Sequence, residues 1–514
     1  MSSLSMNHPA FLHWQIIAAM LLCGVVAGCA TLEPPAAAQS AREVRGTWLT
    51  TTANSAIATP ADTAASMRRL RDIGLNTVYV EVWKNGYTQF PSRALEKMIG
   101  VSMRPHAIPQ VPSDSNVVRQ RPPRDLLQET LIEAQRNGLV TIAWFEYGFM
   151  AAHHTTQNHL RRMKPELLSR DINGNAVAPN GFVWMNPLHP ETRQLLLEIV
   201  LEAVDKYDLD GVQLDDRMVW PYVSMGYDDY TKKIYAAEHH GATPPTDHTD
   251  AAWMRWRADK VNDYARMFVQ EVRARRPGLI ISLSPAVYPW SWQHYLLEWP
   301  KWSAWSEKDT LKNVSPAAQK ILPRWDEFIP QVYRIGYPAF EKTWLEQVEH
   351  LRMLGADRQR DMLAGIRVVG EGRNATWVEL RDAITLVRQT GGGHVLWFSR
   401  GVLDVYPQEL AAFYAGHVES PKVPAGWRKP SIAMFRQHSA AGFAAGRNAW
   451  VHPDLPRGSY RLIGFDGTTW QYLDEQTITR HSSVNSSTVF FVDGQYSQIE
   501  LILDRREGMR RARQ

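Results

Sequence analysis

Eight short apolar segments, separated by stretches with the composition of helices, run along the chain from residue 45 to residue 399. Parallel strands cannot be joined by a tight turn and need a crossover connection, which is usually a helix. Regular alternation of the two kinds of segment therefore predicts βα units and a parallel sheet. The expected strands cover residues 45–50, 77–82, 140–146, 211–215, 279–284, 328–333, 363–368 and 394–399.

Eight such units over residues 42–415 predict an α/β fold, a (β/α)₈ TIM barrel with long loops. The alternative is a doubly wound open sheet. That fold usually places a glycine-rich phosphate-binding turn after its first strand. The residues that follow Thr50 contain no such turn, which favours the barrel.

Two segments inside the barrel region have clear local signals. The first helix is expected to have Thr59 as its N-cap and Pro60 in its first turn, and to end near Gly74. Residues 92–124 are rich in proline and serine and lack helical periodicity. They are expected to form a long loop on the face of the barrel that carries catalysis.

The pattern changes after Ala415. Residues 420–427 have the composition of a linker, and short alternating apolar runs separated by turns follow. Residues 420–514 are therefore expected to form a small β-sandwich-like domain that ends in a basic, solvated tail. Its expected strands cover residues 459–463, 487–492 and 498–503.

The first 28 residues predict export. They contain no Lys, Arg, Asp or Glu, and their apolar run, residues 14–26, is shorter than the about 20 residues that span a bilayer. The run ends in Val26-Ala27-Gly28-Cys29, which resembles the lipobox of bacterial lipoproteins. We expect cleavage before Cys29, acylation of its thiol and a tether over residues 29–41. The alternative is an uncleaved anchor or a buried helix.

These features favour a lipid-anchored protein of the bacterial envelope, and Ala30 after the acylated cysteine favours the outer membrane, facing the periplasm. The only cysteines are Cys23 and Cys29, so the mature chain would hold no disulfide. With 57 basic and 53 acidic residues, the net charge of +4 does not suggest a nucleic-acid partner. No metal-ligand spacing is present beyond the weak pair His153 and His154, and we expect neither metal nor cofactor.

Carboxylates gather where the predicted strands end, which is where barrel enzymes place their catalytic groups. The strand at 211–215 ends in Asp215 and is followed by Asp216. Neighbouring carboxylates raise each other's pKa, so one is readily protonated, as an acid–base pair requires. The alternative for this pair is an N-cap or an ion pair with Arg217. Further candidates near strand ends are Glu146, a possible acid after two aromatic residues, and the weaker Glu81 and Glu371.

Aromatic residues crowd the same strand ends. Each one alone is more easily explained by packing, but a rim of them suggests stacking on the apolar faces of sugar rings. The members of this expected rim are Trp83, Tyr87, Trp220, Tyr222, Tyr288, Trp290, Trp292, Tyr333 and Trp397.

Several of these motifs together resemble those of the glycosyl-hydrolase-like family 10 lipoproteins, a barrel family that includes a divisome-associated peptidoglycan glycosidase. The resemblance covers about residues 42–415. It rests on Arg45-Gly-Thr-Trp48, Gly74-Leu-Asn-Thr77, Ala143-Trp-Phe-Glu146, Trp184-Met-Asn-Pro-Leu-His-Pro190, Asp210-Gly-Val-Gln-Leu-Asp-Asp216 and Pro330-Gln-Val-Tyr333.

The resemblance implies hydrolysis of envelope glycan, with peptidoglycan strands stripped of peptides as the expected substrate. Residues within or beside these motifs become candidate substrate-binding residues. One departure concerns Glu81-Val-Trp83, where many relatives are expected to carry an arginine, so the role of that strand is not carried over. The added candidates are Trp184, Asn186, His189, Arg217 and Gln331.

Two mechanisms are compatible with the carboxylate pair. In the first, Asp215 is the nucleophile of a retaining reaction, and Glu146 or Asp216 is the acid. In the second, Asp215 orients an acetamido group that attacks the anomeric carbon, and Asp216 protonates the leaving oxygen. The competing class is a non-catalytic glycan-binding lipoprotein, which would need the aromatic rim but no acid–base pair.

The lipobox interpretation is directly testable. Replacing Cys29 by alanine should abolish lipid labelling, because Cys29 is the one thiol at the expected cleavage site. The measurement is incorporation of radiolabelled palmitate, with Cys23→Ala as the matched control that should keep the label. Continued labelling of the Cys29 variant would contradict the prediction.

Overall fold

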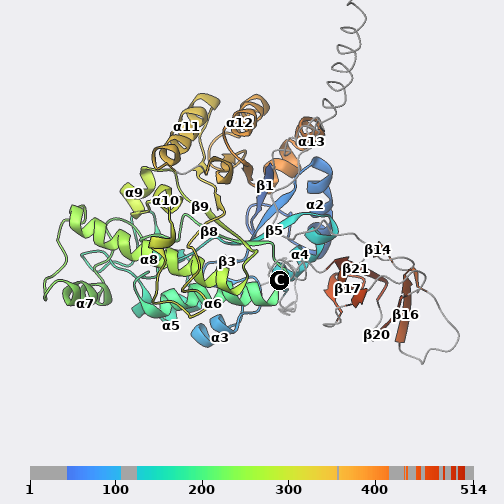
Figure 1. Ribbon diagram of the computed structural model, residues 1–514, viewed down its shortest axis with the longest axis horizontal. Coiled ribbons are helices and arrows are strands. Elements are labelled where there is room, and N and C mark those ends of the chain that lie inside the picture. The colour runs from blue at the N-terminus through green and yellow to red at the C-terminus, as the bar shows by residue number, and fades with distance from the viewer. Residues whose placement is uncertain are drawn as a thin grey trace, which may run out of the picture. The chain divides into compact units, whose positions relative to one another are not determined.

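The computed structural model describes residues 43–105, 124–355 and 358–415, and beyond them the strands and adjoining turns that lie between residues 433 and 503 (Figure 1). The expected signal segment, Cys29, the tether, the linker at 420–427 and the basic tail lie outside the described residues. Within the described part, no helix is both long enough and apolar enough to cross a membrane.

The strands of the large domain form one parallel sheet, and they coincide with the eight segments expected from the sequence. The order in the sheet is β10-β9-β8-β5-β2-β1-β13-β12-β11. The strands are β1 (Val44–Leu49), β2 (Thr77–Glu81), β5 (Val140–Phe145), β8 (Gly211–Asp215), β9 (Ile280–Ser284), β10 (Glu327–Phe328), β11 (Gln331–Val332), β12 (Ala364–Arg367) and β13 (Gly393–Trp397).

The two ends of this path are halves of one interrupted strand. Only Ile329 and Pro330 separate β10 from β11, and β10 pairs with β9 while β11 pairs with β12. Across the break, the Ile329 N–H donates to Leu283 at 2.7 Å, and the Pro330 carbonyl accepts from Gly365 at 3.0 Å. The sheet is therefore bonded on both sides of this segment and closes into an eight-stranded barrel, which confirms the predicted fold.

Helices cover the outside of the barrel between successive strands (Figure 1). Helix α2 (Pro60–Ile73) has the predicted ends, because the Thr59 side chain accepts from the N–H of Asp62 and Gly74 has φ +105°. The other helices of this layer are α4 (Leu126–Arg136), α6 (Pro190–Lys206), α8 (Ala251–Arg275), α11 (Tyr337–Met353), α12 (Trp377–Thr390) and α13 (Pro407–Ala415).

The expected loop at residues 92–124 needs a correction. Its first part is helix α3 (Arg93–Ile99), whose N-cap Ser92 accepts from the N–H of Leu95. Leu95 and Ile99 are buried, so this short helix is held by packing on one face even though it is too short to show a periodic pattern. Residues 106–123 of the expected loop lie outside the described part.

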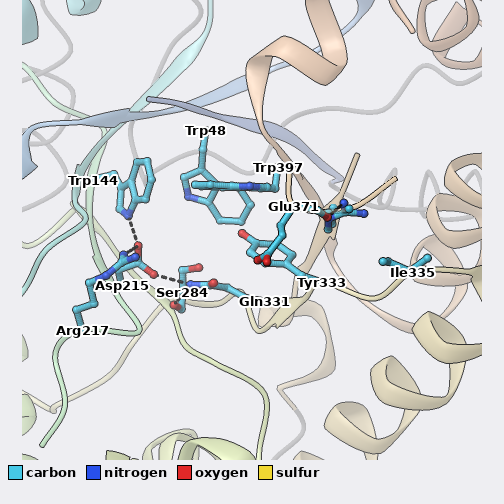
Figure 2. A pocket seen from close by; sticks show the side chains of 12 residues that line it. Trp48, Trp144, Asp215, Arg217, Ser284, Gln331, Tyr333, Ile335, Glu371 and Trp397 are labelled. Carbon is cyan, nitrogen blue, oxygen red and sulfur yellow. Dashed lines mark hydrogen bonds and ion pairs between the residues drawn. The ribbon is translucent and has the colours of Figure 1, made fainter. Parts of the chain in front are cut away.

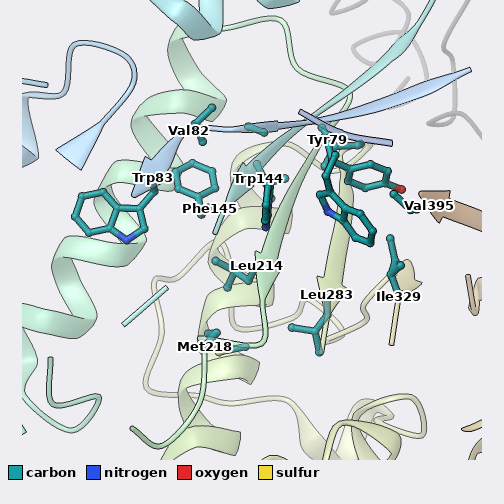
Figure 3. Packing of buried hydrophobic residues seen from close by; sticks show 14 of the residues in the cluster. Tyr79, Val82, Trp83, Trp144, Phe145, Leu214, Met218, Leu283, Ile329 and Val395 are labelled. Carbon is teal, nitrogen blue, oxygen red and sulfur yellow. The ribbon is translucent and has the colours of Figure 1, made fainter. Parts of the chain in front are cut away.

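The inner face of the barrel combines large apolar side chains with a few satisfied polar groups. Tyr79, Trp144 and Val395 lie on this face (Figure 3). The buried Trp48 indole donates to Gln213 at 2.8 Å, and the Tyr79 hydroxyl donates to Glu327 at 3.0 Å. Buried polar groups are tolerated where they find partners, so these bonds let polar residues occupy the interior.

The C-terminal region forms two antiparallel sheets in the described part of the chain. The expected strands are present as β17 (Gly458–Phe465), β20 (Thr488–Asp493) and β21 (Gln498–Leu503). The packing of the two sheets as a sandwich stays a prediction. One sheet contains β14 (Ala433–Met434), β17, β18 (Trp470–Tyr472), β19 (Ile478–Arg480) and β21, and the other contains β15 (Arg436–Gln437), β16 (Arg447–His452) and β20.

A buried ion network lies where the chain enters the barrel. The Glu43 carboxylate binds Arg45 and Arg388, each at 2.7 Å, and His394 lies 3.6 Å away. Burial alone would raise the pKa of Glu43, but the charges of His394, Arg388 and Arg45 lower it to about 2. Because the folded pKa lies below the ordinary value of 4.5, ionised Glu43 stabilises the folded state above pH 4.5, and this contribution is lost as the pH falls towards 2.

Replacing Glu43 by glutamine should lower the free energy of unfolding at neutral pH by about 3–5 kcal/mol, because two buried guanidinium groups lose their anion. The difference between wild type and variant should shrink as the pH falls from 4.5 towards 2. Urea unfolding across this range is the measurement. Glu349→Gln, which breaks an exposed Arg352 pair, is the control. A pH-independent difference would contradict the assignment.

Candidate active site

A cavity of about 560 Å³ opens at the carboxyl ends of the barrel strands (Figure 2). It lies where the fold predicts a catalytic face. The residues that line it are Trp48, Trp144, Asp215, Arg217, Ser284, Gln331, Tyr333, Ile335, Arg367, Glu371, Gly372 and Trp397.

Four aromatic rings form one wall of the cavity (Figure 2). Trp48 lies at the centre, with the Trp144 and Trp397 rings 6.2 and 5.9 Å from it between centroids. Tyr333 lies 5.7 Å from Trp397, tilted by 33°. Tyr333 and Trp397 are the partly exposed rings of this wall, and the buried Trp48 and Trp144 support them from behind. A flat apolar ring beside polar groups suits a ligand that, like a sugar, has both apolar faces and hydroxyl edges.

Asp215 is held from four directions. Its Oδ2 accepts from the Trp144 indole at 2.9 Å and from Arg217 at 3.0 Å. Its Oδ1 accepts from the Gln331 amide at 2.6 Å and from the backbone N–H of Asp216 at 2.7 Å. Since a carboxylate has about four lone-pair sites, this set of donors occupies all of them.

Opposing influences act on the proton affinity of Asp215. Burial and the neighbouring Asp216 carboxylate raise the pKa of Asp215 well above its ordinary value, while Arg217 lowers it. Asp216 itself is half-buried, and its Oδ1 has no hydrogen-bond donor among the described residues. Two adjacent carboxylates with different surroundings are the arrangement that separates an acid from a base.

One arginine nitrogen joins three carboxylates. Arg217 Nη1 lies 3.0 Å from Asp215, 3.5 Å from Asp216 and 3.5 Å from Glu146. The three bound oxygens are therefore no more than about 7 Å apart in any pair. This limit includes the separation of about 5–5.5 Å between the two carboxyl groups of retaining glycosidases.

A second cation extends the cluster away from the cavity. Lys84 Nζ lies 3.0 Å from Glu146 and 2.8 Å from Glu81. Burial, together with the charge of Glu146, raises the pKa of Glu81 to about 7. Four carboxylates thus share two cations.

The loops after β5 and β8 touch closely, which sets the distance between Glu146 and the aspartate pair. The Phe149 N–H donates to the Arg217 carbonyl at 2.9 Å. Gly148 has φ +44°, and a Cβ atom there would lie 2.5 Å from the same carbonyl oxygen. Only glycine permits this contact.

The structure brings part of the expected site together. The expected residues that line the cavity are Asp215, Arg217, Gln331, Tyr333, Glu371 and Trp397. Three more expected residues lie beside the cavity and are connected to it by ion pairs: Glu146, Asp216 and Glu81.

The expected aromatic rim is corrected at Trp83 and Trp220, and the binding role expected from the family motifs is corrected at Trp184. All three side chains are fully buried. The indoles of Trp83 and Trp220 donate to the carbonyls of Gly148 and Met225 at 3.0 and 2.9 Å. These rings pack beneath the loops that follow the strands, and none of them lines the cavity.

Other expected binding residues also lie away from the cavity. Asn186 is buried and donates to Asp228 at 2.8 Å, and His189 caps the N-terminus of α6. Tyr288 packs against His350, and the exposed Trp290 stacks on His294. The adjacent His153 and His154 belong to no group of metal-ligating side chains among the described residues.

Sequence reasoning missed Trp48, Trp144, Arg367 and Lys84. The first three lie on strands with alternating faces, and Trp144 shares its face with Glu146, two residues on. This period-two relation was the signal available for Trp144. Lys84 follows β2 in the hairpin of β3 (Trp83–Lys84) and β4 (Tyr87–Thr88), and no pattern in the sequence marks it.

Residues 43–350 match the glycosyl hydrolase-like 10 family. The match covers more than half of the chain, and the protein belongs to this family.

Curated relatives include glycosyl hydrolase YngK of Bacillus subtilis, 24% identical over 51% of this chain and 49% of that protein, and glycosyl hydrolase DigH of Escherichia coli K12, 24% identical over 55% of this chain and 65% of that protein. The chain thus matches about half to two thirds of the length of these relatives. Among solved structures, the PgaB glycoside hydrolase domain of Bordetella bronchiseptica aligns with a TM-score of 0.49 at 11% identity, over 72% of this chain and 98% of that one.

Replacing Gly148 by alanine should separate the β5 and β8 loops and lower turnover of a cleaved glycan by about 10²-fold, the effect of a displacement near 1 Å on catalytic geometry. Gly174→Ala is the matched control, because Gly174 also has positive φ (+84°) but no atom near its Cβ position. Initial rates of both variants are the measurement. Equal rates would contradict the role given to this contact.

Proposed function

We propose that the protein is an exported glycoside hydrolase that cleaves an N-acetylated cell-envelope glycan, with peptidoglycan strands as the substrate. The observation that carries the proposal is the sharing of Arg217 by Asp215, Asp216 and Glu146 at the edge of an aromatic-walled cavity. Membership of the glycosyl hydrolase-like 10 family supports it, as do the relatives named glycosyl hydrolases.

The hydrogen bonds of Asp215 favour one of the two mechanisms. A nucleophile must offer a lone pair to the anomeric carbon, yet all four lone-pair sites of Asp215 are taken by N–H donors. A substrate acetamido N–H can replace the Gln331 amide, which lines the cavity, and exchange one donor for another. This favours the route in which Asp215 orients the acetamido group and the acetamido oxygen attacks.

Asp216 then serves as the acid. Its Oδ1 makes no hydrogen bond among the described residues and lies 3.5 Å from Arg217 Nη1, and we assign to it the proton that passes to the leaving oxygen. Glu146, ion-paired with Arg217 and Lys84, sets the charge around the pair. In the alternative route, Asp215 attacks after losing the Gln331 bond.

A non-catalytic glycan-binding protein is the second candidate. It would use the same aromatic wall, but it would have no need to bury several carboxylates around one guanidinium, which carries a desolvation cost. Zymography on purified glycan strands separates the two candidates, because a binding protein leaves no cleared band.

Asp215→Asn and Asp216→Asn should each lower the rate on acetylated glycan by at least about 10²-fold, the low end for loss of a general acid or base. The amide is nearly isosteric, so both variants should fold. The rates follow from product mass spectrometry, and the exposed Asp229→Asn is the control. Wild-type rates in both variants would remove the catalytic assignment.

The route is decided by inhibitors. If the acetamido group attacks, a thiazoline analogue should inhibit strongly, and de-acetylated strands should resist cleavage. If Asp215 attacks, a fluorosugar should label it covalently, which peptide mass spectrometry detects.

A further inference from the structure

Two polar side chains of the cavity keep N–H groups without an acceptor among the described residues. Arg367, at the end of β12, is 8% exposed and makes one hydrogen bond to the described residues, from its Nη2 to the backbone carbonyl of Glu371. No carboxylate pairs with it among the described residues. Trp397 at the end of β13 lies beside it in register, and its indole N–H has no partner in that same set of residues.

The other indoles of the cavity differ from Trp397. Trp48 donates to Gln213 and Trp144 donates to Asp215. A buried guanidinium without an anion destabilises the folded protein through its desolvation cost. An N–H that lines a cavity and has no acceptor can bind an acceptor of a ligand and so recover its own desolvation cost. The Arg367 and Trp397 donors are therefore available to a ligand.

The loop above these donors leaves room for that ligand. Gly370 has φ +136°, and a Cβ atom there would lie 3.5 Å from Trp397 Nε1 and 3.8 Å from Arg367 Nε. Both donors thus border one small space that a side chain would fill. Glu371 also lines the cavity, but its carboxylate forms no ion pair with Arg367 in the described part of the chain. The positive charge of Arg367 can therefore pair with an anionic group of a ligand.

We infer that Arg367 and Trp397 form a receptor for a carboxylate carried by a sugar of the bound glycan. Guanidinium is the side chain best suited to a planar carboxylate, and the indole N–H adds one donor. The inference rests on the proposed function for its choice of sugar. In an N-acetylated envelope glycan, this carboxylate belongs to the lactyl group of a muramoyl residue. The lactyl carboxylate becomes an uncharged amide when a peptide is attached.

This receptor lies in the same cavity as Asp215. A carboxylated sugar held there places a neighbouring glycosidic bond near the aspartate pair, so recognition and cleavage act on one strand. The site would discriminate against peptide-substituted muramoyl residues, because the amide offers no charge to Arg367 and brings a bulky chain against the Gly370 loop.

Binding of small sugars tests the receptor without any need for turnover. N-acetylmuramic acid should bind roughly 10- to 100-fold more tightly than its methyl ester, the range expected for hydrogen bonds to a charged group. Tryptophan fluorescence or calorimetric titration gives both affinities. In Arg367→Gln the ratio of the two affinities should fall to about one, while the exposed Arg352→Gln should keep the wild-type ratio.

Trp397→Phe provides a second variant should Arg367→Gln fail to fold. It keeps an aromatic ring but removes the N–H, so the acid-to-ester ratio should fall. Glucuronic acid and N-acetylglucosamine complete the series. A preference for glucuronic acid over N-acetylmuramic acid would support the carboxylate receptor and assign it to a uronic sugar.

Equal binding of acid and ester by the wild-type protein would overturn the receptor, even if the protein cleaves glycan. Conversely, an intact acid-to-ester preference in a protein that cleaves no glycan would support the receptor and remove the proposed hydrolysis. The two failures are therefore distinguishable.

Discussion

The site depends on one broken strand. Residues 327–332 pair with β9 on one side and with β12 on the other, and the barrel closes only through them. Pro330, which has no N–H to donate, lies at the break between the two halves. Directly after it, Gln331 donates to Asp215 on β8, the second strand along in the sheet. The segment that completes the fold thus also fixes the carboxylate at the centre of the site, so closure and site geometry cannot vary independently.

The balance of charge explains why so many ionisable groups can be buried together. Glu81, Glu146, Asp215 and Asp216 would carry four negative charges, against two positive charges on Lys84 and Arg217. Coulomb repulsion at low dielectric is large. Together with burial it raises the pKa of Glu81 to about 7, so this carboxyl group can hold a proton near neutral pH. Protons held this way near neutral pH are what acid–base catalysis needs, whereas a purely structural network would gain more from matched charges.

The sequence alone was sufficient to predict the barrel and the proximity of Asp215 and Glu146, whose catalytic roles stay a prediction. Strand alternation has period two, and parallel strands end on one face, so Asp215 and Glu146 could be placed together before any coordinates. The aromatic residues were harder. Trp83 and Trp220 follow their strands as Trp290 does, but whether a ring after a strand turns inward depends on loop packing. Arg367 and Trp48 lie inside apolar runs, where a sequence pattern indicates core and gives no sign of a cavity.

The two arginines of the cavity are in opposite electrostatic states, although both lie at strand ends. The charge of Arg217 is already paired with three carboxylates of the protein, so it contributes little to the binding of an anionic ligand. Among the described residues, Arg367 binds only a backbone carbonyl. The indoles differ in the same way, since Trp144 donates to Asp215 while Trp397 donates to no atom in the described part of the chain. Side chains whose hydrogen bonds are all made within the protein keep a fixed geometry, which favours catalysis. Donors that lack a partner in the protein gain most from a charged ligand, which favours discrimination between ligands. One cavity can therefore separate cleavage from recognition by how completely the protein satisfies its own polar groups.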